Sequence, residues 1–205
     1  MSISQRIDCP MRLPMTSDYL IHQARCATSM SFNSWLAFRN ILKMVEFKQE
    51  LKRAIESHYA KVRESFNDLY GYTLYTDDSL CSIGPVCNRE SDITVPATDE
   101  MYRYYKYIAV EWANFDDFGI FDGVNSLLAN IMDCDHPEWE ERRQEVLEIC
   151  LNTLFELDKN NLFGSKDSGR FIAICIADSN DPIMDRSAKL LNQASVYEAY
   201  AKEFA

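Results

Sequence analysis

Residues 70–87 have the sequence YGYTLYTDDSLCSIGPVC, in which two apolar runs flank a short polar segment. In the first run, every second residue from Tyr70 to Leu74 is large and apolar, a spacing typical of a β-strand. The polar residues 76–79 end this strand, and LCSIGPVC at 80–87 predicts a returning strand that stops at Gly84-Pro85. The stretch therefore predicts a β-hairpin.

The hairpin raises the question of what the adjacent carboxylates of Asp77 and Asp78 do. Neighbouring residues on a strand point to opposite faces, so two adjacent carboxylates rarely converge on one substrate atom. In a turn, aspartate bonds to its own backbone and tolerates unusual dihedral angles. We therefore interpret the pair as turn residues. The alternative is that one of them, singly, lines a pocket at the edge of the sheet.

The segments around the hairpin predict helices and one more strand. RFIAICIAD at 170–178 is a short, almost unbroken apolar run, which predicts a central strand near 171–177 that is buried on both faces. Apolar residues recur at helical spacing in four other segments. The expected helices cover residues 44–67, about 137–159, 185–193 and 195–204. This pattern predicts an α+β domain, with a mostly antiparallel sheet packed against several helices.

Residues 1–43 differ in composition from the rest of the chain. They carry five basic residues and two acidic ones, a net charge of +3, which leaves −14 for residues 44–205 out of the total of −11. One interpretation is an organelle-targeting leader, which is typically rich in Arg and Ser and poor in acids. We favour the other, a poorly ordered or mis-annotated start with Met44 as the first residue, because MVEFKQEL begins a helix directly. The expected domain is 44–205.

The strongly acidic charge limits the classes of partner. Hydrophobic residues make up 47% of the chain, enough for a substantial core. An acidic surface repels phosphate backbones and anionic lipid heads, so we expect neither nucleic acid nor a membrane surface as the main partner. A basic protein is the expected class of partner. No stretch is apolar enough to span a bilayer, and seven cysteines at irregular spacing suggest no disulfide framework, which favours the reducing cytoplasm.

Motifs of catalysis and of cofactor binding are not found in the sequence. Cys81 and Cys87 have five residues between them, unlike the short C-x-x-C pairs of zinc sites, and we expect no metal and no cofactor. H-E-x-x-H, the P-loop, G-x-G-x-x-G and G-x-S-x-G are all missing. The remaining polar candidates are Asp77, Asp78 and Glu111, together with Arg170, which precedes the predicted buried strand.

A second group of candidates is aromatic. Glu111 stands beside Trp112, and several tyrosines, among them Tyr105 and Tyr107, precede it. Such rings favour interfaces because one end is apolar and the other forms hydrogen bonds. Trp112, Tyr105 and Tyr107 therefore form a candidate interface, and core packing is the simpler alternative. Arg170 is expected to form a structural ion pair unless it meets Asp77 or Glu111 across the sheet.

The order of these segments resembles a known family. FKQELKRAIESHYAKVRE, YGYTLYTDDSLCSIGPVCNRES, YKYIAVEW, VLEICLNTLFELDKNNLFG, RFIAICIADS and RSAKLLN together resemble the bacterial family called domain of unknown function 4303. The resemblance covers nearly everything after residue 43. It implies a bacterial cytoplasmic single domain and supplies no reaction and no catalytic residues. The chain departs from the family pattern at NRESD, where Arg89 stands in place of a small polar residue.

Two functions from different classes are consistent with these features. We favour a non-enzymatic protein-binding module, similar to the immunity proteins that neutralise partner toxins, because the charge suits a basic partner. The alternative is a hydrolase-type enzyme that uses a carboxylate and arginine site at the sheet edge. This alternative requires Asp77, Glu111 and Arg170 to converge on one concave pocket.

Overall fold

The structure is a computed structural model that describes residues 31–115, 118–132 and 137–203. The chain divides into two compact units, Met1–Leu42 and Lys43–Ala205. In the first unit, the side chain of Ser31 accepts a hydrogen bond from the Ser34 N–H and caps helix α2 (Phe32–Ser65). The helix expected over residues 44–67 therefore begins earlier, within the predicted leader. The leader's residues 1–30 lie outside the described residues.

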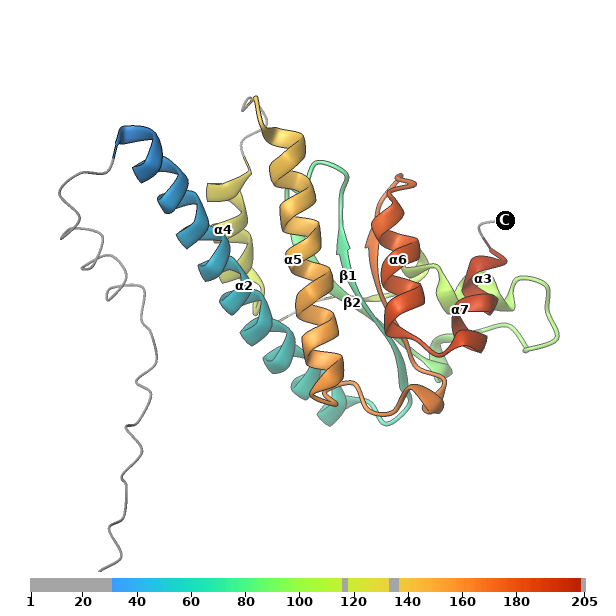
Figure 1. The fold of residues 1–205 in the computed structure, drawn as a ribbon. Coiled ribbons are helices and arrows are strands. Elements are labelled where there is room, and N and C mark those ends of the chain that lie inside the picture. Colours follow the sequence, from blue (N-terminus) through green and yellow to red (C-terminus); the bar gives the residue numbers. More distant parts are fainter. Residues whose placement is uncertain (1–30, 116–117, 133–136, 204–205) are drawn as a thin grey trace, which may run out of the picture. The chain divides into compact units, whose positions relative to one another are not determined.

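The second unit contains the hairpin, two further strands and most of the helices (Figure 1). Two helices expected near the end of the chain are present. After α2, the elements in chain order are β1 (Leu69–Thr76), β2 (Ile83–Arg89), η1 (Glu90–Asp92), α3 (Tyr102–Tyr107), η2 (Ala109–Glu111), β3 (Asn114–Phe115), α4 (Asp122–Ile131), α5 (Trp139–Lys159), η3 (Lys166–Ser168), β4 (Phe171–Ile176), α6 (Pro182–Leu191) and α7 (Ala194–Ala201).

The four strands form one mixed sheet in the order β3-β2-β1-β4. β1 pairs antiparallel with β2, and β2 pairs antiparallel with β3, whereas β1 and β4 run parallel from Gly71↔Phe171 to Thr76↔Ile176. The parallel pair brings together two strands that are far apart in the sequence, with the long helix α5 in the connection between them. The α+β class and the mostly antiparallel sheet are confirmed.

The predicted end of β2 at Gly84-Pro85 is wrong, because the strand continues to Arg89. Proline lacks an N–H and is tolerated in a strand where no neighbour needs that donor. Within the described residues, the short strand β3 pairs with β2 only at Val86 and Cys87. The Ile83 N–H donates to the side chain of Asn125 on α4, at 2.8 Å.

β4 is buried, as predicted, but it lies at the edge of the sheet and not at its centre. Helix α6 lies alongside it (Figure 1) and supplies side chains to the outer backbone groups of the strand. Ser187 accepts a hydrogen bond from the Ile174 N–H at 2.9 Å, and Asn192, just after α6, accepts one from the Ile172 N–H at 2.8 Å. These bonds satisfy the donors that a further strand would otherwise take.

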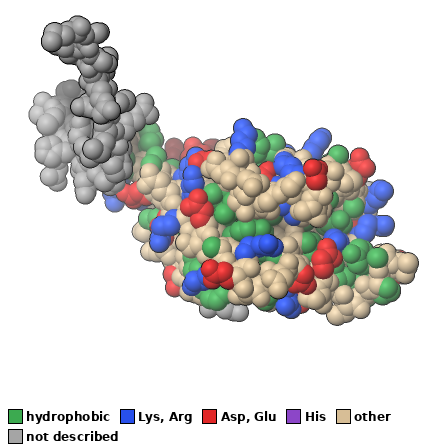
Figure 2. Space-filling view, turned by 90° about the horizontal axis from the view of Figure 1, so that it is seen from below, with side chains coloured by type: hydrophobic (Ala, Val, Ile, Leu, Met, Phe, Trp, Pro, Cys, Tyr) green, Lys and Arg blue, Asp and Glu red, His purple; other side chains and the backbone are tan. Residues whose placement is uncertain are grey.

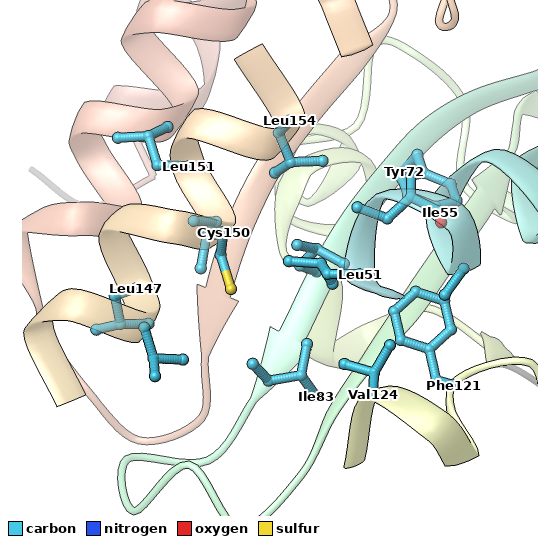
Figure 3. Close-up of a cluster of buried hydrophobic side chains, with 14 of the residues drawn as sticks. Leu51, Ile55, Tyr72, Ile83, Phe121, Val124, Leu147, Cys150, Leu151 and Leu154 are labelled. Atoms are coloured by element: carbon cyan, nitrogen blue, oxygen red, sulfur yellow. The ribbon is translucent and has the colours of Figure 1, made fainter. Parts of the chain in front are cut away.

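Two hydrophobic clusters cover the two faces of the sheet. In the larger one, side chains from α2, α4 and α5 meet β1 and β2, as Figure 3 shows for Leu51, Val124, Cys150 and Tyr72. The smaller cluster joins the opposite face to α3, η2 and α7, through residues such as Trp112 and Tyr200. This second face carries the candidate site.

Candidate functional site

Asp77 has the role that the turn interpretation predicts. Its carboxylate accepts a hydrogen bond from the Cys81 N–H at 3.2 Å, and its carbonyl accepts one from the Leu80 N–H at 3.1 Å. Leu80 itself has a φ of 52°, in the left-handed region that tight turns use. Asp77 therefore holds the connection between β1 and β2.

Asp78 meets a residue that the sequence reasoning missed. Arg143 on α5 donates to the Asp78 carbonyl at 2.9 Å, to the Asp78 carboxylate at 2.8 Å and to the Asp181 carboxylate at 2.7 Å. The side chain of Arg143 is 5% exposed. Asp181 in turn caps α6 by accepting from the Ile183 N–H at 2.9 Å. Arg143 therefore joins the hairpin turn, α5 and the start of α6. Its place on the apolar stripe of α5, between Trp139 and Val146, was the available signal.

Arg170 forms the structural ion pair that was its default expectation. Its guanidinium pairs with the buried carboxylate of Asp158 and donates to the carbonyls of Gly164 at 3.2 Å and Leu191 at 3.3 Å. Arg170 precedes β4, whereas Asp77 and Asp78 follow the parallel strand β1. At about 3.3 Å per residue, the two ends of these strands are roughly 20 Å apart. The structure does not bring Arg170 to the aspartates.

The aromatic candidates are mostly core residues, in agreement with the core-packing alternative. Trp112 and Tyr107 are 2% and 8% exposed, and only Tyr105 is half-buried. The Trp112 indole packs on Gly71, where an added Cβ would lie 2.6 Å from the ring. Because Gly71 has no side chain, the large ring packs directly on the sheet and is buried there instead of lying at the protein surface.

Glu111 stands apart from the other polar candidates. Its carboxylate accepts a hydrogen bond from the Tyr104 hydroxyl at 2.8 Å on the exposed side of η2. Each of the four polar candidates therefore has its own partner, and in the part of the chain that the structure describes no two of Asp77, Glu111 and Arg170 line the same cavity.

A hollow forms on the second face of the sheet where two small residues stand side by side. Thr73 of β1 is in register with Ala173 of β4, and the side chains at both positions point to the same face. Their neighbours along β4, Phe171 and Cys175, are larger. The small pair therefore forms the floor of a cavity of about 310 Å³, which we call the β4 pocket.

The walls of the β4 pocket are largely aromatic and apolar. Tyr75, Tyr107, Phe171 and Tyr200 line it, together with small and aliphatic residues of η2 and β4. Among the described residues that line it, Asp178 is the only charged one. The lining includes residues that follow the carboxyl end of β4, and open sheets with parallel strands commonly bind ligands near these ends of their strands.

The cysteine in this pocket is a poor candidate nucleophile. Burial raises the pKa of the Cys175 thiol to about 11, so the thiol stays protonated at neutral pH. A thiol attacks as its thiolate, and reactive cysteines have lowered pKa values. Cys175 is therefore suited to packing against a ligand and not to covalent chemistry.

Exposed apolar side chains adjoin the β4 pocket. Val110, which lines the pocket, is 52% exposed, and Phe115 on β3 is 48% exposed. The Phe115 ring packs edge-on against Tyr75, with ring centroids 6.3 Å apart. We call Tyr75, Val110, Phe115 and Asp178 the Tyr75 surface. Sequence reasoning missed it, because the exposure of Val110 and Phe115 depends on which segments cover the sheet.

A larger cavity, of about 600 Å³, lies at the opposite ends of β1 and β4. Arg63, Asp68, Glu90 and Arg170 contribute to it, so both signs of charge are present. Arg170 already donates to Asp158 and to two carbonyls. Figure 2 shows that acidic and basic side chains are also interspersed on the face seen from below. The β4 pocket has the more uniform lining and is the better candidate for recognition.

The part of the chain that the structure describes contains neither a metal cluster nor a membrane-spanning helix. Within it, no three His, Cys, Asp or Glu side chains lie together in a way that would hold a metal ion. None of the helices there has the length and apolar character needed to span a membrane.

Comparison with known proteins identifies a family and no individual relative. No curated protein and no solved structure matches the chain significantly. The family described as "Domain of unknown function (DUF4303)" matches residues 51–193, which is more than half of the chain. The matched range includes all four strands, and α7, with Tyr200, follows it. The chain therefore belongs to the family of the domain of unknown function DUF4303.

Proposed function

We propose that this domain is a non-enzymatic protein-binding module that takes a basic protein partner at the Tyr75 surface. The observation that carries the proposal is the β4 pocket beside the exposed side chains of Val110 and Phe115. Protein interfaces commonly have an apolar and aromatic centre with polar groups at the rim. The Tyr75 surface has this composition, because the exposed residue Asp178 adds a carboxylate to its apolar and aromatic side chains.

The charge of the domain supports a basic partner. Residues 44–205 carry −14, and both Asp77 and Asp178 act at the Tyr75 surface. Burial raises the pKa of the Tyr75 phenol first, and the negative charges near it, including those of Asp178 and Asp77, raise it further. A negative field of this kind speeds encounter with positively charged partners and discriminates against acidic ones.

Within this class, an immunity-like role in the bacterial cytoplasm is the proposal that suits the chain best. Immunity proteins of this kind are small acidic domains that bind and neutralise a toxin. Free cysteines such as Cys87 and Cys150 are compatible with a reducing compartment. The hydrolase alternative lacks a comparable observation, because Asp77, Glu111 and Arg170 each bind different residues.

A capture experiment with matched variants tests the proposal. The tagged full chain is incubated with lysate of its native host at low and at moderate salt. We expect a basic protein that is retained at low salt, retained less at moderate salt, and lost from Val110→Arg. The control is Leu190→Arg, at a residue of α6 that is 42% exposed and away from the Tyr75 surface. Recovery of no protein partner at either salt, or equal recovery with both variants, would contradict the proposal.

A further inference from the structure

The β4 pocket has the size of a site for one long side chain. Its volume of about 310 Å³ lies at the lower end of the range of roughly 300–1,000 Å³ found for small-molecule sites. A folded segment of a partner needs more room. A protein partner would therefore enter the pocket with a single residue, in the manner of the anchor residues that dominate many interfaces.

The lining of the pocket favours a side chain with an apolar stem and a cationic end. The floor of Thr73 and Ala173 offers no charge, and Tyr107 and Tyr200 contribute aromatic rings to the lining. Aromatic faces attract cations, and a planar guanidinium stacks on them better than an ammonium does. The methylene stem of arginine packs on apolar walls while its head stays near the mouth.

The position of Asp178 gives the cationic end a partner. The Ala177 N–H donates to the Thr76 carbonyl at 2.9 Å, which holds the end of β4 beside β1. Asp178 follows with a φ of 52°, in the left-handed region that aspartate and asparagine tolerate better than most residues. Asp178 is exposed and lines the pocket, so its carboxylate is available to pair bidentately with a guanidinium.

We infer that the β4 pocket receives one arginine side chain of the basic partner, with its guanidinium on the Asp178 carboxylate and its stem on the aromatic walls. The inference rests on the proposed function and names the chemistry that the partner presents. Charge complementarity selects this occupant: Asp178 is the only charge among the described lining residues, and it is negative.

Small probes test the pocket without the partner. Isotope-labelled full chain is titrated with N-acetyl-arginine amide, N-acetyl-lysine amide and N-acetyl-norleucine amide, and the backbone amide signals are followed by NMR. We expect the arginine amide to shift the signals of β4 and Asp178, and the uncharged norleucine amide to bind about tenfold more weakly. Equal binding of norleucine amide, or of lysine amide, would overturn the assignment to a guanidinium. So would the lack of any shift at β4.

The matched variants are Asp178→Asn and Asp167→Asn. Asparagine accepts the left-handed backbone at position 178, so the first variant removes the charge and keeps the turn. Asp167 is an exposed residue of η3, which precedes β4, and serves as the control. We expect about tenfold weaker binding of the arginine amide by Asp178→Asn alone. Equal loss in both variants would show a general charge effect and refute the pocket.

The same variants separate the two proposals. If lysate capture yields a basic partner that Asp178→Asn retains fully, and the arginine amide does not bind, the inference fails and the proposed function stands. If the arginine amide binds through Asp178 but no protein partner is recovered, the proposed function fails and the pocket stands as a site for a free guanidinium compound.

Discussion

Removal of the Ser187 hydroxyl should destabilise the domain through the edge of the sheet. Ser187 is 0% exposed, and its oxygen accepts the Ile174 N–H at 2.9 Å on the side of β4 that has no partner strand. In Ser187→Ala this donor stays buried without an acceptor. A buried unsatisfied polar group costs about 1–3 kcal/mol, so we expect the free energy of unfolding to fall by that amount.

The control for this prediction is Thr153→Val on α5. Thr153 is also 0% exposed, and its hydroxyl donates to the Ile149 carbonyl at 2.7 Å, one helical turn earlier. That carbonyl keeps its own helical hydrogen bond when the hydroxyl is removed, so no buried group loses its only partner. We expect Thr153→Val to change the free energy of unfolding by less than about 0.5 kcal/mol.

Urea unfolding of the two variants and hydrogen exchange of the Ile174 amide measure the effect. The unfolding midpoint and its slope give the change in free energy, and exchange reports whether the Ile174 N–H has lost protection. If Ser187→Ala is no less stable than Thr153→Val, side-chain hydrogen bonds do not close this edge, and the reasoning is refuted.

Substitution of Asn192 should destabilise the edge of β4 more than substitution of Ser187 does. The side-chain oxygen of Asn192 accepts a hydrogen bond from the Ile172 N–H at 2.8 Å, and its side-chain nitrogen donates one to the Ile172 carbonyl at 2.7 Å. The backbone of a neighbouring strand would form the same two bonds. Asn192→Leu leaves both groups unsatisfied, and we expect a loss about twice that of Ser187→Ala. It also leaves the outer edge of β4 without its side-chain partner at this position, so we expect more concentration-dependent self-association, measured by light scattering.

Three further perturbations test other parts of the fold. Gly71→Ala places a methyl group against the Trp112 ring, 2.6 Å away, and should cost about 1–3 kcal/mol in urea unfolding and shift the tryptophan emission. Burial raises the pKa of Asp181, but a backbone N–H of α6 and the Arg143 guanidinium outweigh it, and the net pKa is lowered. The ionised carboxylate therefore stabilises the fold above its unfolded pKa of about 3.9, and this contribution is lost as pH falls through the folded pKa. In Asp181→Asn, the free energy of unfolding should depend less on pH in this acidic range. Cys175, whose pKa is raised by burial to about 11, should resist alkylation at pH 8 in the native protein and react in urea, as peptide mass spectrometry will show.

The hairpin and the long helix α5 were predictable because each has a local signal. Alternation over residues 70–76 predicted β1, and the apolar stripe after Pro137 predicted α5. The position of β4 was not predictable in the same way. An apolar run indicates burial on both faces, but burial at an edge arises here from Ser187 and Asn192, and nothing in a run of nine residues shows what its neighbours will be.

The polar candidates show a second limit of sequence reasoning. Arg170, Asp78 and Glu111 were found because charged residues beside predicted strands are conspicuous, and all three do form close polar contacts. The partners of Asp78 and Arg170, however, come from a distant segment, because Arg143 and Asp158 both lie on α5. Residue type and position relative to a strand identify groups that need a partner, but the partner is determined by the parallel pairing of β1 with β4 and the helix that connects them.

The β4 pocket follows from that same pairing. Thr73 and Ala173 are both unremarkable in sequence, and each is expected in a strand. They form a floor only because the register Thr73↔Ala173 sets two small side chains beside each other on one face. A shift of β4 by one residue would place Ile172 or Ile174 there and fill the hollow. The hydrogen bonds of Ser187 and Asn192 hold β4 in place against α6. These two residues therefore also help to maintain the register of β4 with β1 on which the pocket depends. Variants at Asn192 should therefore weaken arginine amide binding although Asn192 does not line the pocket.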